Sequence, residues 1–263
     1  MIIINSIKLI KGDCLEQMDK LIEQNIKVDM ILTDIPYGTT ACRWDEIIPF
    51  DKMWERINLI KKDKHTPILL FGSEPFSSKL RLSNIKNYKY DWKWNKTKPV
   101  GFANAKKMPL KNIEDICTFY EKLPTYNPQG LIKCDRVINN STKQFKQNNI
   151  TAINGGAFKT KIYKQEYTNY PRQLLKFNIQ QGLHPTQKPT DLLSYLIKTY
   201  SNSNDVILDF TMGVASTGIS CIETNRNFIG IEKDDKYFDI GVNRINTYLK
   251  DNNLEDNWNV EIE

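Results

Sequence analysis

The sequence predicts an α/β fold built on a doubly wound, mostly parallel sheet. Short apolar runs of strand length alternate with segments of helical spacing through residues 7–120 and again through 184–263. Three of these runs end at or next to an acidic residue, namely Asp34, Asp209 and Glu232. Because ligands bind at the carboxyl ends of the strands in open α/β sheets, these acidic residues are the first candidates for a functional site.

Length and composition favour one α/β domain with an insertion. The 263 residues exceed the roughly 200 that such a domain needs, and the hydrophobic content of 40% is ordinary for a globular protein. No run approaches the ~18 apolar residues of a membrane span, and Met1-Ile2-Ile3-Ile4 is too short for a signal-peptide core. We therefore expect a cytoplasmic protein without a membrane partner. The five cysteines are scattered without C-x-x-C spacing, and there are two histidines, so we expect neither disulfides nor a metal site.

The first block of the chain, residues 1–120, predicts five strands and two helices. Apolar runs, or alternating aromatic residues in the fourth case, predict strands at 7–10, 28–33, 67–71, 88–94 and 113–120. Amphipathic spacing predicts helices from about residue 14 to 22 and from 50 to 60. The run at 28–33 stops at Asp34-Ile35-Pro36-Tyr37, which places a carboxylate, an exposed main-chain carbonyl and an aromatic ring at the carboxyl end of a buried strand. Two hydrogen-bond acceptors and a stacking ring are what activation of an exocyclic amino group requires.

The middle of the chain, residues 121–183, breaks this rhythm. It is rich in Pro, Gly, Asn and Gln, and it holds ten Lys or Arg residues against three Asp or Glu residues in a chain of net charge +6. We predict an irregular basic insertion with short strands. Such a surface attracts phosphate and is a footprint of nucleic-acid binding, although charge alone favours a merely solvated basic surface equally.

Residues 184–263 return to regular alternation and predict a nucleotide-binding βαβ unit. We expect a helix from Lys188-Pro189-Thr190 through Ile197, strands at 206–210 and 227–232, a loop at 213–218, and helices at 219–223 and 237–249. Glu232 lies 23 residues after Asp209, near the ~20-residue spacing at which an acidic side chain meets ribose hydroxyls. The G-x-G-x-x-G pattern of dinucleotide sites fails at Ala215, whereas S-adenosylmethionine has no phosphate and needs no such loop. Taken alone, this segment is equally compatible with an ordinary strand–loop–helix.

Four motifs in one order resemble a known family. Asp34-Ile35-Pro36-Tyr37, the basic insertion, His184-Pro185-Thr186-Gln187-Lys188-Pro189 and Asp209-Phe210-Thr211-Met212-Gly213 follow one another as in the β group of DNA amino-methyltransferases, which methylate N6 of adenine or N4 of cytosine. The resemblance implies a circularly permuted Rossmann-like methyltransferase fold. It divides the chain into a catalytic half (1–120), a target-recognition insertion (121–183) and a cofactor-binding half (184–263).

The resemblance also implies roles for individual residues. In the expected catalytic motif Asp34, Ile35, Pro36 and Tyr37, the Asp34 carboxylate and the Ile35 carbonyl accept hydrogen bonds from the target amine, and Tyr37 stacks on a flipped base. The residues that it assigns to S-adenosylmethionine are Asp13, Cys14, Asp34, Lys188, Pro189, Asp209, Phe210, Gly213 and Glu232. Three departures stand out: Ile35 replaces a proline, Val214-Ala215 replace the frequent Ser and Gly, and Asn112 precedes Ile113-Glu114 where relatives often carry a His-Glu pair.

The predicted activity is methyl transfer to N6 of adenine in duplex DNA, by direct in-line attack without a covalent enzyme intermediate. Asp at the head of the motif is more often associated with adenine and Ser with cytosine, so N4 of cytosine is the alternative. An RNA or protein amino-methyltransferase and an inactive DNA-binding relative remain further readings. The expected DNA contacts of the insertion are Lys133, Arg136, Lys143, Lys146, Lys159, Lys161 and Arg172. A homodimer and a cognate restriction endonuclease are conceivable further partners, and no sequence feature decides either.

Overall fold

The computed structural model describes residues 5–38, 45–139, 162–180, 182 and 187–263. Its contacts divide the chain into two compact units, one formed by residues 1–127 with 173–263 and the other by residues 128–172. Among the described residues, no helix is long and apolar enough to cross a bilayer.

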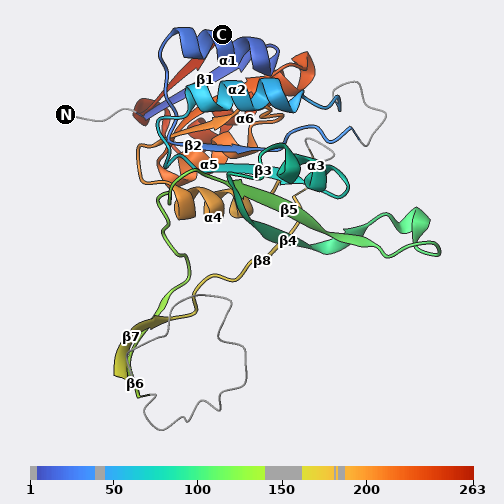
Figure 1. Cartoon of the computed structure of the whole chain (residues 1–263). Coiled ribbons are helices and arrows are strands. Elements are labelled where there is room, and N and C mark those ends of the chain that lie inside the picture. The colour runs from blue at the N-terminus through green and yellow to red at the C-terminus, as the bar shows by residue number, and fades with distance from the viewer. Residues whose placement is uncertain (1–4, 39–44, 140–161, 181, 183–186) are drawn as a thin grey trace. The chain divides into compact units, whose positions relative to one another are not determined.

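The first unit is built on a large mixed sheet (Figure 1). Its strands are β1 (Asn5–Lys11), β2 (Met30–Thr33), β3 (Ile68–Gly72), β4 (Tyr88–Val100), β5 (Lys111–Phe119), β8 (Leu174–Phe177), β9 (Val206–Asp209), β10 (Asn227–Glu232) and β11 (Trp258–Ile262). They lie in the order β11-β1-β10-β9-β2-β3-β5-β4-β8. The pairs from β11 to β3 are parallel, whereas β5 runs antiparallel to both β3 and β4. This arrangement confirms the predicted α/β class.

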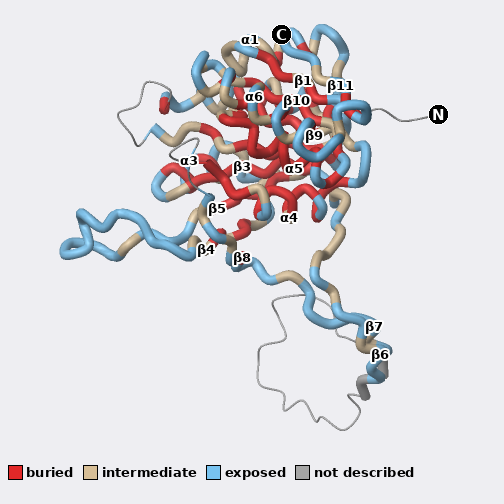
Figure 2. Tube along the Cα trace, turned by 180° about the vertical axis from the view of Figure 1, so that it is seen from behind, coloured by how far each residue is buried: buried red, intermediate tan, exposed pale blue. Residues whose placement is uncertain are grey.

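Helices cover both faces of the sheet. They are α1 (Cys14–Glu23), α2 (Phe50–Ile60), α3 (Phe76–Ser83), α4 (Thr190–Tyr200), α5 (Ser216–Thr224) and α6 (Asp235–Asp251), with short 3₁₀ turns η1 (Phe102–Asn104) and η2 (Glu255–Asn257). Alternate residues of one strand enter different cores: Leu32 joins the cluster beneath α4, α5 and α6, while Ile31 joins the cluster beneath α1, α2 and α3. Figure 2 shows the resulting buried interior. Burial on both faces explains why β2, β3 and β9 are continuous apolar runs.

The order of the strands brings distant parts of the sequence together. The β9–α5–β10 unit comes from the C-terminal third of the chain, yet its strands lie between β1 and β2. Ile31 of β2 therefore pairs with Leu208 of β9. The carboxyl end of β2, where Asp34 follows, is thus placed beside the carboxyl end of β9, where Asp209 lies.

Three differences between the predicted and the observed elements stand out. Helix α5 begins at Ser216, although the sequence predicted a loop to residue 218, because Ser216-Thr217-Gly218 are buried small residues without an amphipathic signal. Helix α3 was not predicted, since its eight residues carry only Phe76 and Leu80 as buried apolar residues. Strand β11 was also not predicted, and it extends the sheet by pairing with β1.

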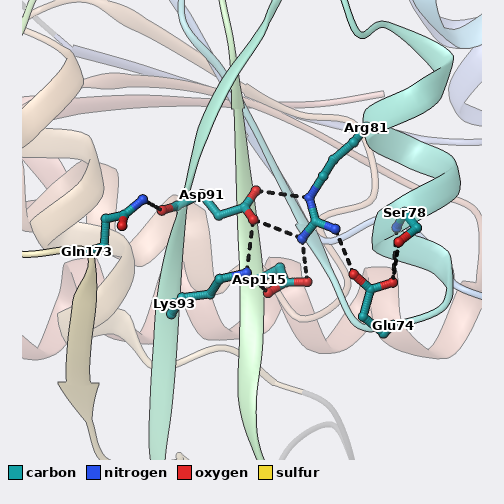
Figure 3. A network of polar contacts seen from close by, with 7 residues as sticks. All are labelled: Glu74, Ser78, Arg81, Asp91, Lys93, Asp115 and Gln173. Atoms are coloured by element: carbon teal, nitrogen blue, oxygen red, sulfur yellow. Dashed lines mark hydrogen bonds and ion pairs between the residues drawn. The ribbon is translucent and has the colours of Figure 1, made fainter. Parts of the chain in front are cut away.

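A charged network fixes α3 against the antiparallel part of the sheet (Figure 3). Arg81 of α3 donates to both carboxylate oxygens of Asp91 on β4 and to Asp115 on β5. Lys93 lies within 2.9 Å of Asp91 and 2.6 Å of Asp115. Burial opposes the charge of Arg81, but its hydrogen bonds to carboxylates outweigh this and raise the pKa of the guanidinium. Gln173 extends the network by donating to the Asp91 carbonyl.

The second unit contains an antiparallel pair of strands among its described residues. These are β6 (Ile132–Asn139) and β7 (Ile162–Thr168), with an irregularity between Lys133 and Arg136. The sequence predicted short strands in an irregular region, and it predicted the wider bounds 121–183 for that region. Strand β8 and the residues from 173 onward belong to the first unit.

Candidate active site

A cavity of about 810 Å³ lies at the carboxyl ends of β1, β2, β9 and β10. It is lined by the residues that follow each of these strands, including Gly12–Leu15, Asp34–Tyr37, Phe210–Val214 and Lys233–Tyr237. Every residue that the sequence assigned to catalysis or cofactor binding lines this cavity except Pro189, which is the N-cap residue of α4. The volume is within the range of small-molecule sites in proteins.

The carboxylate of Asp34 is held by two side chains from different parts of the fold. The Tyr37 hydroxyl donates a 2.6 Å hydrogen bond to Oδ1, and the Lys188 ammonium contacts Oδ2. The Tyr37 ring stacks on Phe76, with ring centroids 5.1 Å apart. Burial and the neighbouring Asp34 charge raise the pKa of the Tyr37 hydroxyl well above its usual value, so it remains a donor at neutral pH.

Lys188 lies between two carboxylates. Its ammonium is 3.5 Å from Oε2 of Glu114, and it also lies 5.0 Å from the centre of the Phe71 ring. The other oxygen of Glu114 is bound by Lys96. Burial works against ionisation of Glu114, but the charges of Lys188 and Lys96 prevail and lower its pKa. The sequence had marked Glu114 only as the neighbour of a missing histidine, and the structure places it in the cavity.

The Asp34–Tyr37 segment is fixed by a residue that the sequence analysis did not identify. Oδ1 of Asp45 accepts hydrogen bonds from the backbone amides of Tyr37 and Gly38, each 2.8 Å long. Asp45 is 8% exposed and lines the same cavity. No sequence pattern singles it out, because it lies outside any predicted helix or strand and acts through backbone atoms.

The carboxylate of Asp209 connects the two halves of the site. It accepts hydrogen bonds from the hydroxyls of Thr33 and Thr217, at 2.7 and 2.6 Å, and from the amide of Thr211. The Thr211 hydroxyl in turn donates to the main-chain carbonyl of Asp34. Burial raises the pKa of Asp209 to about 6 despite these hydrogen bonds. Asp209 therefore acts here as the centre of a buried hydrogen-bond network.

Glu232 and Gly213 line another part of the cavity and are hydrogen-bonded to each other. Oε2 of Glu232 accepts from the Gly213 amide and Oε1 from the Asp234 amide, at 2.9 and 2.8 Å. Each oxygen of a carboxylate can accept more than one hydrogen bond, so Glu232 retains capacity for a hydroxyl ligand. Gly213 has φ +53°, a conformation that suits glycine.

The remaining cofactor-side residues occupy more varied positions. Asp13 is the N-cap of α1, accepts from the Leu15 amide and lies 3.3 Å from Lys233. Burial raises the pKa of the Cys14 thiol to about 12, so it stays protonated. The Phe210 side chain is packed in the core and is 1% exposed. Ala215 adopts φ +57° at the N-terminus of α5, a left-handed conformation that glycine adopts more readily than alanine.

The predicted DNA contacts belong to the second unit. Lys133 and Arg136 are exposed on β6, and Arg172 is exposed at the end of that unit. Lys133 lies 3.5 Å from Asp135. The other four predicted contacts, Lys143, Lys146, Lys159 and Lys161, lie outside the described residues.

Comparison with known proteins identifies similar chains. Type II methyltransferase M1.MboII from Moraxella bovis is 26% identical over 274 residues, which cover 95% of this chain and 98% of that protein. Type II methyltransferase M.HinfI from Haemophilus influenzae is 24% identical over 265 residues, covering 90% of this chain and 67% of that protein. The crystal structure of the M1.HpyAVI–SAM complex superimposes with a TM-score of 0.62 at 24% identity, covering 90% of this chain and 99% of that one. This likeness shows the fold.

A family model gives the more general assignment. The model of the DNA methylase family N6_N4_Mtase matches residues 28–243, which include the Asp34–Tyr37 segment, the basic insertion and the β9–α5–β10 unit. The match spans most of the sequence and agrees with the order of motifs that suggested the resemblance. The chain therefore belongs to the N6_N4_Mtase family of DNA methylases.

Proposed function

We propose that the protein transfers a methyl group from S-adenosylmethionine to N6 of adenine in duplex DNA. The observation that carries this proposal is one shared cavity. The Asp34–Tyr37 segment and the Asp209–Glu232 unit both line it, and the Thr211 hydroxyl joins them by donating to the Asp34 carbonyl across 177 residues of sequence. The proposal takes the Asp34–Tyr37 segment as the part that binds the amine and the Asp209–Glu232 unit as the part that binds the cofactor.

The residues at the cofactor end fit S-adenosylmethionine. Glu232 at the end of β10 offers carboxylate oxygens suited to ribose hydroxyls, and Gly213 leaves room for close approach of a ligand to the backbone. Asp13 and Cys14 line the same end of the cavity. The cofactor would supply an electrophilic methyl group on a sulfonium. A related protein, M1.HpyAVI, has been crystallised with SAM.

Asp34 is the proposed activator of the target amine. The lone pair of an exocyclic amine is delocalised into its ring, and acceptors for both N–H bonds favour a tetrahedral nitrogen and stabilise the positive charge that develops on it. The Asp34 carboxylate and the Ile35 carbonyl are these acceptors. Because Tyr37 and Lys188 already hold the Asp34 oxygens, the incoming amine shares or displaces one of these contacts.

The target atom is inaccessible within a stacked duplex, so the proposal includes base flipping, with Tyr37 as the stacking surface. The second unit would recognise the DNA sequence, and exposed Lys133, Arg136 and Arg172 are its proposed phosphate or base contacts. Adenine is favoured over cytosine by the aspartate at the head of the motif. The same chemistry at N4 of cytosine is the second candidate, since the family includes both activities.

The proposal is tested by transfer of a labelled methyl group from S-adenosylmethionine to unmethylated duplex DNA, followed by nucleoside analysis. We expect N6-methyladenine, whereas N4-methylcytosine would change the base and keep the mechanism. Asp34→Ala should abolish transfer and preserve cofactor binding, and Asp251→Ala, at the exposed C-terminal end of α6, is the matched control. Residual activity within about tenfold of wild type, a loss below ~1.4 kcal/mol, would remove Asp34 as a main catalytic group.

A further inference from the structure

The β4–β5 hairpin carries a second basic surface outside the insertion. Residues 97–113 contain four lysines (Lys98, Lys106, Lys107 and Lys111) and no Asp or Glu. All of these residues are exposed except Leu110, which is half-buried. Figure 2 shows the hairpin as a continuous exposed arm of the first unit. A stretch of unopposed positive charge of this kind attracts phosphate.

The hairpin projects from the edge of the sheet at which the cavity lies. Asp115 of β5 pairs with Gly72 at the carboxyl end of β3 and with Lys93 of β4. Strand β4 then continues to Val100, about seven residues beyond Lys93, or roughly 23 Å at ~3.3 Å per residue. That length matches about seven base pairs of B-form duplex at ~3.4 Å each.

The root of the hairpin is held by ion pairs and adjoins the cavity. Lys93 and Asp115 belong to the charged network with Arg81 shown in Figure 3. Farther along the two strands, Lys96 of β4 binds Glu114 of β5, which in turn lies 3.5 Å from Lys188 in the cavity. The arm is therefore fixed relative to Asp34 through paired strands and ion pairs.

The tip of the hairpin is an ordered turn that presents an aromatic side chain. Gly101 adopts φ +89°, and the amides of Asn104 and Ala105 donate to the carbonyls of Gly101 and Phe102. Phe102 is 84% exposed and lies between Lys98 and the Lys106-Lys107 pair in sequence. Exposed apolar side chains flanked by basic residues are typical of elements that contact the sugars and bases of a groove.

We infer that the β4–β5 hairpin is a second DNA-binding element, which binds the duplex beside the target base. Its lysines contact backbone phosphates, and Phe102 makes an apolar contact in a groove. The positive charge of the hairpin favours a nucleic acid as its partner. Because the hairpin lies at the edge of the cavity, this nucleic acid is expected to be the same duplex that contains the target base. This inference rests on the proposed function, because DNA is the substrate in that proposal.

The test compares two variants that remove the same charge. Lys106→Gln/Lys107→Gln neutralises the hairpin tip, and Lys20→Gln/Lys250→Gln neutralises exposed lysines near the C-terminal ends of α1 and α6, toward the opposite edge of the sheet. Binding of fluorescent duplex DNA is measured by anisotropy as a function of salt concentration. We expect the hairpin variant to lose about tenfold in affinity near 0.1 M salt and to lower the log–log salt slope by up to about 2, since each phosphate contact contributes ~0.9. The control variant should change neither quantity by as much.

Phe102→Ala separates apolar contact from charge. It should weaken DNA binding about tenfold and leave the salt slope unchanged, because it releases no counterions. Cofactor affinity and melting temperature, measured for each variant, should equal those of wild type. If the hairpin variant binds DNA no more weakly than the control, the inference is overturned while methylation by the wild type keeps the proposed function. Hairpin-dependent DNA binding by a wild type that transfers no methyl group would support the inference and refute the proposed function, and a wild type that does not bind DNA would overturn both.

Discussion

The Tyr37 hydroxyl donates a 2.6 Å hydrogen bond to Oδ1 of Asp34, three residues before it in the chain. Tyr37, which is expected to stack on a flipped base, is therefore hydrogen-bonded to Asp34, whose carboxylate is expected to bind the target amine. With Lys188 on the other oxygen, the Asp34 carboxylate, which we propose to be catalytic, is held from both sides. Preorganisation of this kind reduces the reorganisation that the site must undergo during the reaction.

The two functions of Tyr37 can be separated by substitution. Tyr37→Phe removes the hydrogen bond to Asp34 and keeps the ring against Phe76, so kcat for DNA methylation should stay within about threefold of wild type. Tyr37→Ala removes the stacking surface as well and should lower kcat/KM by roughly 10- to 100-fold. Single-turnover methylation measures both variants. If Tyr37→Phe loses as much as Tyr37→Ala, the hydroxyl itself is needed and the stacking role is wrong.

Asp45 should act as a positioning residue, since it binds the backbone of the Asp34–Tyr37 segment. Asp45→Ala leaves two backbone amides without their carboxylate, so we expect kcat to fall at least about tenfold, a cost within the range for hydrogen bonds to a charged group. Asp45→Asn retains an acceptor oxygen and should recover part of the loss. Cofactor affinity should be unchanged in both variants.

Asp63→Ala is the matched control for Asp45. It also removes a carboxylate that accepts from a backbone amide, that of His65, but in an exposed turn. We expect its methylation rate to equal that of wild type. Equal losses in Asp45→Ala and Asp63→Ala, with equal losses in melting temperature, would reduce the role of Asp45 to general stability.

Lys188 should hold the carboxylates of Asp34 and Glu114 in place through its ion pairs with both. Lys188→Met keeps the length of the side chain and removes its charge, which leaves Asp34 and Glu114 without their shared cation. We expect a loss of about 3–5 kcal/mol in the free energy of unfolding, measured in urea at pH 7, because one partner of a buried ion pair is removed. The double variant Lys188→Met/Glu114→Gln should regain part of it, and strictly additive losses would show that the two residues are uncoupled.

The sign of the pH effect of Glu114 follows from its lowered pKa. An acid with a lowered folded pKa contributes stability above its unfolded pKa of ~4.3, and this contribution is lost as pH falls through the folded value. Loss of Lys188 raises the folded pKa of Glu114, so Lys188→Met should lose less stability than wild type on acidification, and the difference between the two proteins should narrow as pH falls. Urea unfolding between about pH 3.5 and 7 measures the difference. Parallel pH profiles would contradict the assignment.

The contribution of Asp209 to the free energy of unfolding should depend on pH with the opposite sign. Burial raises its pKa to about 6, so between ~3.8 and 6 the folded state binds more protons than the unfolded state. Wild-type stability should therefore fall by about 2 kcal/mol from Asp209 alone between pH 4.5 and 7. Asn at position 209 does not titrate. As pH rises from 4.5 to 7, the stability of Asp209→Asn relative to wild type should therefore increase by the same amount. A constant difference across this range would show that Asp209 is ionised throughout.

Periodicity in the sequence was sufficient to predict most strands of the sheet and the edge of the sheet at which the site lies. The runs that end near Asp34, Asp209 and Glu232 are buried on both faces, and parallel packing necessarily brings their carboxyl ends to one edge. The contact of Lys188 with Asp34 spans 154 residues and depends on where α4 begins, which no local pattern specifies. Asp45 was missed for a related reason, because a carboxylate that binds backbone amides leaves no periodic signal.

The ion pairs of Arg81 should contribute more to the free energy of unfolding than those of Arg56, although the two arginines are almost equally exposed. Arg81 and Arg56 are 17% and 18% exposed. Two partners of Arg81, Asp91 and Asp115, are buried and a third, Glu74, is exposed, whereas the side chains of Asp19 and Glu55, the partners of Arg56, are both exposed. Arg81→Ala leaves two buried carboxylates with Lys93 as their remaining cation in the network and should cost about 3–5 kcal/mol. Arg56→Ala removes pairs with exposed partners and should cost about 1 kcal/mol or less. Urea unfolding at neutral pH measures both variants, and equal losses would mean that the network at the root of the β4–β5 hairpin contributes no more to stability than a surface pair.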